Sequence, residues 1–222
     1  MTHSAHTRGD LTHLYFLLDR SGSMNSIVED TVGGFDAFIA EQRKTPGECR
    51  VTLAQFDDAY EEVYADRPIA DVPSLVLQPR GTTALLDSVA RIVLDAGKRL
   101  AALPEDQRPG TVIVGIMTDG LENASREWSH PQVKQLIETQ TRDYQWQFLY
   151  LGADQDAVEV GMSIGVGAGH SVTYGRGKVK QAMAATAANV SSYRQARAGG
   201  MPAPAAAALS EFTEEQRRAA QD

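Results

Sequence analysis

"LYFLLDRSGSM", residues 14–24, is the stretch that decides the fold. The apolar residues 14–18 run without a break into Asp19, and two hydroxyl side chains follow at Ser21 and Ser23. A short continuous apolar run is typical of a strand that is buried on both faces, as in a parallel sheet. Polar residues directly after such a strand lie at the carboxyl edge of the sheet, where ligands bind. The stretch therefore predicts a parallel sheet with a polar site at one edge.

The rest of the chain alternates between short apolar runs and segments of helical period. Residues 111–118, "TVIVGIMT", form a second continuous apolar run that Asp119 follows. The short link around Asp57 and Asp58 indicates the turn of an antiparallel hairpin. We expect strands at residues 13–19, 50–56, 60–68, 111–118, 147–151 and 171–174, and helices at residues 27–43, 84–103, 131–143, 155–164 and 178–198. This order predicts an α/β fold, a three-layer Rossmann-like doubly wound sheet that is mostly parallel.

Composition limits the class of function. The chain has 222 residues, enough for one sizeable domain, and a formal net charge of −8. That charge argues against nonspecific binding to nucleic acid or to an anionic membrane, since both need a basic surface. The polar N-terminus lacks the pattern of a secretion signal, no apolar run approaches the roughly 20 residues that cross a bilayer, and Cys49 is the single cysteine. We expect a soluble, cytoplasmic protein.

Three loops at the predicted carboxyl edge carry oxygen ligands. They contribute Asp19, Ser21, Ser23, Thr82 or Thr83, and Asp119. Carboxylates and hydroxyls are the ligands that hard divalent cations such as Mg²⁺ prefer. Because hydroxyls are neutral and weak donors, an ion held mostly by them stays electron-poor and keeps a coordination position for an outside anion.

The motifs "DRSGSM", "GTTAL" and "MTDG", in this order, resemble the metal-ion-dependent adhesion site (MIDAS) of von Willebrand factor type A (VWA) domains. The family's metal-binding positions match Asp19, Ser21, Ser23, Thr83 and Asp119. Thr83 is chosen over its neighbour because the family's threonine usually stands two residues after the loop glycine. The resemblance implies a six-stranded sheet between layers of helices, with one short antiparallel edge strand that residues 60–68 fit.

The resemblance also implies binding and no catalysis. In the family, Mg²⁺ or Mn²⁺, with Ca²⁺ as a further candidate, takes its last ligand from a Glu or Asp of a protein partner. Bacterial intracellular members of this kind work within larger assemblies. We expect Arg20 and Met24, beside the metal loop, to help select the partner. The domain is expected to span residues 11–198, and residues 199–222 to form a linker and C-terminal tail with a short docking helix as an option.

Alternatives stay open at several positions. Glu122 and Asn123 could orient water on the metal, or Asn123 could cap the turn that follows it. Asp87 is expected to be a charge at a helix N-terminus and no ligand. A structural scaffold with a vestigial metal site is the main alternative function. A metal-dependent phosphatase or hydrolase fits less well, because Ser21 stands where haloacid-dehalogenase chemistry needs a second carboxylate.

Overall fold

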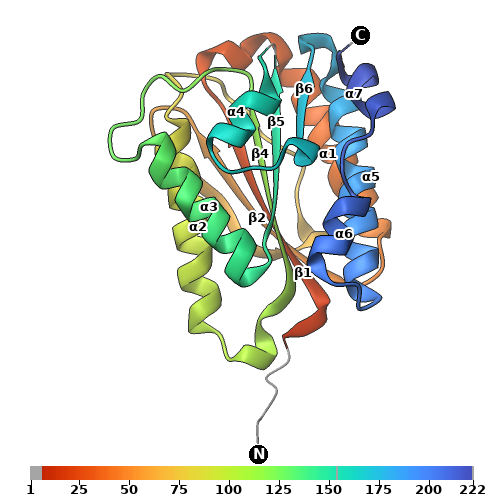
Figure 1. Cartoon of the computed structure of the whole chain (residues 1–222). Helices are drawn as coiled ribbons and strands as arrows, with labels where there is room; N and C mark the ends of the chain where they lie inside the picture. Colours follow the sequence, from red (N-terminus) through yellow and green to blue (C-terminus); the bar gives the residue numbers. More distant parts are fainter. Residues whose placement is uncertain (1–6, 154, 222) are drawn as a thin grey trace, which may run out of the picture.

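A single sheet forms the centre of the computed structural model, which describes residues 7–153 and 155–221 (Figure 1). Its six strands follow the order β3-β2-β1-β4-β5-β6, and only the β2–β3 pair is antiparallel. The strands are β1 (Arg8–Asp19), β2 (Glu48–Phe56), β3 (Tyr60–Pro68), β4 (Pro109–Thr118), β5 (Gln147–Ala153) and β6 (Ser171–Tyr174). The predicted α/β class, with residues 60–68 as the antiparallel edge strand, is confirmed.

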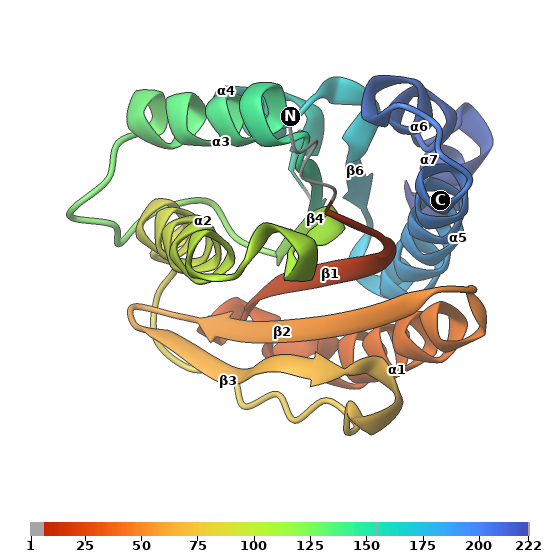
Figure 2. The ribbon, with the colours of Figure 1, turned by 90° about the horizontal axis from the view of Figure 1, so that it is seen from below.

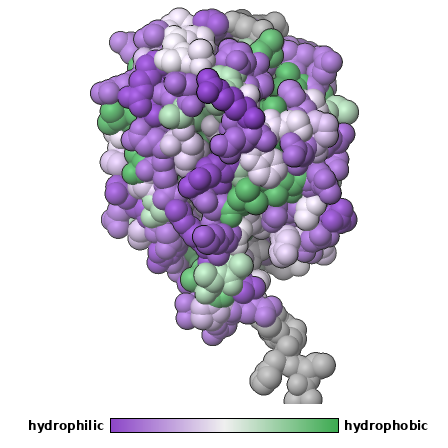
Figure 3. Space-filling model, turned by 90° about the vertical axis from the view of Figure 1, so that its left-hand side faces the viewer, coloured by the Kyte–Doolittle hydropathy of each residue, from purple (hydrophilic) through white to green (hydrophobic). Residues whose placement is uncertain are grey.

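Helices cover both faces of the sheet, because a parallel sheet buries both of them. They are α1 (Val28–Lys44), α2 (Leu85–Ala102), α3 (His130–Tyr144), α4 (Ala157–Ser163), α5 (Val179–Ala198), α6 (Ala203–Leu209) and α7 (Glu214–Gln221). Side chains alternate along β1, so that Phe16 and Leu18 pack with α1 and α5, and Tyr15 and Leu17 pack with α2 and α3. Figure 2 shows these two layers from below. The outer side of α2 and α3 is mostly hydrophilic, with small hydrophobic areas (Figure 3).

The element bounds agree with the expected ones or differ from them by one or two residues, except at the start of β1. This strand begins at Arg8, whose N–H donates to the carbonyl of Arg108 at 2.8 Å. Backbone pairing needs no apolar side chain, so hydrophobic periodicity could not reveal this extension. Within the described ranges, no helix combines the length and hydropathy that a membrane-spanning segment requires.

The chain after α5 turns back along α5 and β6 (Figure 1). Phe212 and Ala220 are buried there, and the N–H of Gly175 donates to the carbonyl of Ala220 at 2.9 Å. The guanidinium of Arg217 donates to the carbonyls of Ser171, at 2.6 Å, and Ala168, at 2.8 Å. Residues 203–221 therefore cover part of the β6 edge of the sheet.

The order of the strands reverses between β1 and β4. From β1 the chain goes outward through β2 to β3, and from β4 it goes outward in the other direction to β6. Ligands of open α/β sheets bind at such a switch point, beyond the carboxyl ends of the two strands. Asp19 is the last residue of β1 and Asp119 directly follows β4, so both predicted carboxylate ligands lie at the switch point.

Candidate metal centre

Asp19 is fully buried at the end of β1, with both carboxylate oxygens engaged. Its Oδ1 accepts the N–H of Ser21 at 2.6 Å, and its Oδ2 accepts the hydroxyl of Thr118 at 2.6 Å. Burial is the largest influence on this carboxyl and raises its pKa to about 6, while the hydrogen bonds from Thr118 and Ser21 act in the opposite direction. Thr118, the last residue of β4, was missed by the sequence reasoning, although it stands directly before a predicted ligand.

The two serines of the first loop connect Asp19 to Asp119. The hydroxyls of Ser21 and Ser23 lie 3.0 Å apart, and the hydroxyl of Ser23 donates to Oδ1 of Asp119 at 2.6 Å. A 3-10 helix, Gly22–Ile27, directly follows Ser21 and turns the loop over the edge of the sheet. The two carboxylates and two hydroxyls thus form one connected group.

Thr83 reaches the same group from the third loop. A Cβ atom on Gly120 would lie 3.2 Å from Oγ1 of Thr83 and 3.5 Å from Oγ of Ser23, so both hydroxyls flank one point beside Gly120. Thr83 is buried, whereas Thr82 is exposed. The structure therefore brings together all five residues of the predicted site, and it places the chosen threonine inside.

The expected role of Arg20 and Met24 in partner selection is wrong, because both side chains are buried. Two acidic residues hold the guanidinium of Arg20: its Nε donates to Oδ2 of Asp57 at 2.9 Å, and its Nη1 donates to Glu61. Arg80 also donates to Oδ2 of Asp57, at 2.9 Å. Sequence position beside a loop does not reveal the direction of a side chain.

Asp57 does more than shape the predicted hairpin turn. Its Oδ1 accepts the N–H of Ala59 at 2.7 Å, as a turn aspartate does, and its backbone carbonyl accepts the N–H of Ala84 at 2.8 Å. Burial opposes its ionisation, but the bonds from Ala59, Arg80 and Arg20 prevail and hold its pKa below the usual range. Asp57 therefore ties the loop of Ser21 and Ser23 to the loop of Thr83.

Glu122 and Asn123 support the site through the backbone. Oδ1 of Asn123 accepts the N–H of Thr83 at 2.9 Å, and the N–H of Asn123 donates to the carbonyl of Thr83 at 3.1 Å. Glu122 accepts the N–H of Leu86 in the first turn of α2 at 2.9 Å. Asp87 accepts three backbone N–H groups of residues 126–128. Its predicted place at a helix N-terminus, in the first turn of α2, is confirmed.

Arg176 brings a positive charge to the group from the loop between β6 and α5. Its Nη1 donates to Oγ of Ser26 at 2.9 Å, and its Nη2 lies 3.9 Å from Oδ2 of Asp119. Arg176 stands 150 positions after Ser26, so no local pattern could link the two. A cavity of about 360 Å³ opens beside Asp119 and Arg176, and Asp156 and Glu159 also line it.

The donor set fits a hard cation better than a soft one. The described residues hold no group of three or more His, Cys, Asp or Glu side chains that could bind a metal ion. The site instead combines two carboxylates, Asp19 and Asp119, with three hydroxyls. Such a set can hold Mg²⁺ or Mn²⁺ through oxygen alone, and it offers none of the nitrogen or sulfur ligands that zinc prefers.

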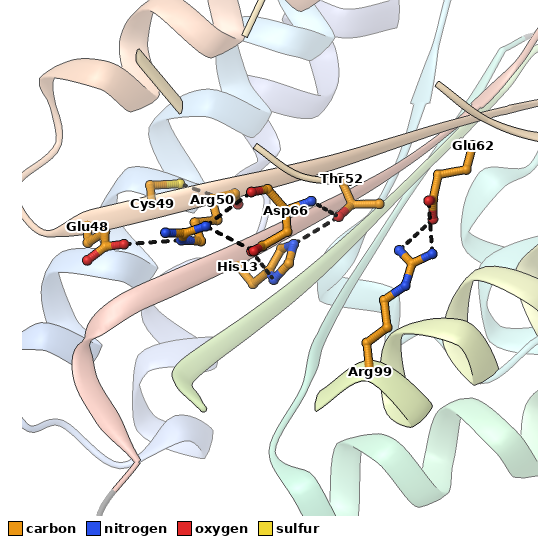
Figure 4. Close-up of polar contacts among 8 residues, drawn as sticks. All are labelled: His13, Glu48, Cys49, Arg50, Thr52, Glu62, Asp66 and Arg99. Atoms are coloured by element: carbon orange, nitrogen blue, oxygen red, sulfur yellow. Dashed lines mark hydrogen bonds and ion pairs between the residues drawn. The ribbon is translucent and has the colours of Figure 1, made fainter. Parts of the chain in front are cut away.

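A second polar cluster lies along β1, β2 and β3 (Figure 4). Nε2 of His13 lies 2.9 Å from Oγ1 of Thr52, and Nδ1 lies 3.9 Å from Oδ1 of Asp66, an acidic neighbour that the sequence did not reveal. A hydroxyl, an imidazole and a carboxylate in this order resemble a hydrolytic triad. Thr52, however, is 1% exposed, and its oxygen accepts the N–H of Asp66 at 3.0 Å. We therefore assign this cluster a structural role.

Neither the models of protein families nor the curated proteins include a match to this chain. Solved structures do match. The vWF domain of the type V pili tip protein Mfa5 from Porphyromonas gingivalis is 11% identical, with a TM-score of 0.56 over 81% of this chain and 94% of that one.

Two further solved structures are similar in fold to this chain. The ArnB paralog VWA2 from Sulfolobus acidocaldarius is 18% identical, with a TM-score of 0.52 over 79% of this chain. A von Willebrand factor type A protein from Catenulispora acidiphila is 13% identical, with a TM-score of 0.52 over 82% of this chain. The chain spans only 44% and 43% of these two proteins. Together with the strand order, these likenesses show that the chain has the fold of a von Willebrand factor type A domain.

Proposed function

We propose that this chain is a protein-interaction module that holds Mg²⁺ or Mn²⁺, with Ca²⁺ as a further candidate, and captures an acidic residue of a partner protein. Asp19, Ser21, Ser23, Thr83 and Asp119 would hold the ion. The observation that carries the proposal is the convergence of these five side chains, from three loops, on the switch point of the sheet. The VWA-like fold supports an interaction role. We propose a cytoplasmic location for the chain and assign it no catalytic step.

The charge balance of the site explains why an acidic ligand fits. The two carboxylates of the site carry the same total charge as a divalent ion, with opposite sign. The three hydroxyls add no negative charge. An ion with neutral ligands remains a good acceptor for a further carboxylate. The bound ion would supply this attraction, while the buried loops keep the protein's own ligands in place.

Calorimetric titration of Mg²⁺ and Mn²⁺ into protein stripped with EDTA tests the proposal. We expect saturable binding of about one ion per chain, and loss of binding in Asp19→Asn, because this change removes half of the negative charge of the site. Asp106→Asn is the matched control, since it removes one exposed carboxylate from the 3-10 helix Glu105–Gln107 outside the site. A metal-dependent protein ligand should then bind the unmutated chain and not Asp19→Asn.

One observation favours the scaffold alternative. Both oxygens of Asp19 and Oδ1 of Asp119 already accept hydrogen bonds from Thr118, Ser21 and Ser23. If the unmutated chain binds neither ion, these bonds are the permanent state of the site, and the scaffold function replaces the proposed one.

A further inference from the structure

The guanidinium of Arg176 lies at the open side of the candidate metal centre. It reaches over from the 3-10 helix Arg176–Lys178, and it contacts both Asp119 and Ser26. The side chain of Arg176 is 44% exposed, whereas that of Asp119 is fully buried. Arg176 therefore places a positive charge between a buried carboxylate and solvent.

A guanidinium and a divalent ion compete for the same carboxylate. Arginine stays charged at every physiological pH, so its attraction for Asp119 does not vanish with a change in protonation. An ion bound by Asp119 would also repel a positive charge that lies 3.9 Å from Oδ2 of that residue. Both effects act against simultaneous occupation of this position by the ion and the guanidinium.

The structure offers the arginine an alternative place. Arg176 lines the cavity of about 360 Å³ beside Asp119, together with Asp156 and Glu159. A long, half-exposed side chain can rotate into this space without a change in the fold, and the two carboxylates would attract it there. Displacement therefore requires a change of rotamer and the loss of the hydrogen bond to Ser26.

We propose that Arg176 is a built-in counter-cation of the metal centre, which pairs with Asp119 until a divalent ion displaces it. This inference rests on the proposed metal site and adds its regulation. The arginine lowers the affinity of the site for metal, and it keeps Asp119 paired when the ion is absent.

Metal titration of Arg176→Gln tests the competition, with Lys178→Gln as the matched control. Lys178 belongs to the same 3-10 helix and carries the same charge, so its removal measures the general effect of charge. Partly exposed ion pairs are modest in strength, so we expect Arg176→Gln to bind Mg²⁺ about three- to tenfold more tightly, and Lys178→Gln less than about twofold. Unchanged or weaker binding by Arg176→Gln, beside normal binding by the unmutated chain, overturns the inference alone.

A double-mutant cycle in EDTA tests the pair without any metal. The variants are Arg176→Gln, Asp119→Asn and the double change, compared by urea unfolding. We expect a smaller effect of Arg176→Gln in the Asp119→Asn background, where the hydrogen bond to Ser26 still contributes but the ion pair does not. Additive effects would contradict the pairing. If none of the chains binds metal while the coupling persists, the proposed function has failed, and Arg176 is a permanent partner of Asp119, not a competitor.

Discussion

The buried carboxylate of Asp57 binds two arginines, and Asp57 links two loops of the candidate site. It accepts bonds from Arg20 and Arg80 and orders the backbone beside Thr83. Removing one partner of a buried ion pair leaves the other charge without compensation, which is the expensive part of such a change. The position of the candidate metal ligands therefore depends on a residue whose described hydrogen bonds go to none of them.

Asp57→Asn should destabilise the chain and weaken metal binding. An amide keeps one acceptor oxygen but loses the second and the negative charge, so we expect a loss of about 2–3 kcal/mol in the free energy of unfolding and a lower affinity for Mg²⁺. Urea unfolding and calorimetry measure the two effects. Asp58→Asn, at the exposed neighbouring position, should change stability little; an equal loss in both variants would contradict the assigned role of Asp57.

His13 makes stability depend on pH. Burial, with smaller effects of Arg50 and Arg99, lowers its pKa to about 3. As the pH falls below about 6.5, His13 is protonated in the unfolded chain but stays neutral in the folded chain. The free energy of unfolding is therefore unaffected by the titration of His13 above that pH and decreases below it. Between pH 6.5 and 5 this one group should cost about 2 kcal/mol.

The comparison of His13→Gln with the unmutated chain isolates this effect. Glutamine can keep a hydrogen bond to Thr52 but does not titrate, so the free energy of unfolding should fall less steeply between pH 7 and 5. Burial also lowers the pKa of His170, but that contribution is common to both proteins and cancels. If the free energy of unfolding has the same pH slope in both proteins, His13 is protonated over the same pH range in the folded and the unfolded chain.

At the scale of elements, the loop of residues 119–129 and the first turn of α2 stabilise each other. Glu122 accepts N–H groups from Leu86, Ala124 and Ser125, and Asp87 accepts three in return. Such bonds satisfy the backbone groups that a helix N-terminus leaves open. The helix α2 is thus part of the support of the candidate metal centre.

Glu122→Ala should loosen this support. We expect a loss of about 1–2 kcal/mol in the free energy of unfolding and faster hydrogen exchange in residues 120–128, since several backbone donors lose their acceptor. Glu127→Ala removes an exposed carboxylate from the same loop and is the matched control. Unchanged exchange in Glu122→Ala would mean that the loop is held by other contacts.

The hydrophobic pattern predicts the buried strands and helices because burial selects apolar side chains, whereas the largely exposed strand β3 is predicted by the short link that joins it to β2. The edge strand Tyr60–Pro68 and the short strand Ser171–Tyr174 have the predicted bounds. The five candidate ligands could be named because two motifs lie at strand ends, the third directly precedes a helix, and the three in this order resemble the family's metal site. The direction of Arg20 and the approach of Arg176 could not be predicted, since they depend on contacts between segments far apart in sequence.

At the scale of the whole molecule, the C-terminal segment completes the layer over α5 and β6. Phe212 and three alanines of this segment, Ala203, Ala206 and Ala220, are buried. An open edge strand can pair with another chain, and residues 203–221 protect part of β6 from this. The segment therefore affects both stability and association.

A chain that ends at Gly199 should be less stable and should associate. Loss of the buried apolar contacts predicts a decrease of about 3 kcal/mol or more in the free energy of unfolding. Urea unfolding and light scattering measure both properties. Phe212→Ala in the full chain should reproduce part of the destabilisation without association; a shortened chain that remains monomeric and equally stable would contradict this role.

The candidate site can form during folding only after the two strands at the switch point, β1 and β4, have paired. Thr118 follows Asp19 by 99 positions, and Asp119 follows Ser23 by 96. The intervening chain contains α1, β2, β3 and α2, so β1 and β4 meet only after this long loop has closed. A nascent chain on the ribosome cannot assemble the oxygen ligands before β4 has emerged. Under the proposed function, metal capture would thereby be restricted to chains whose central strands are already paired.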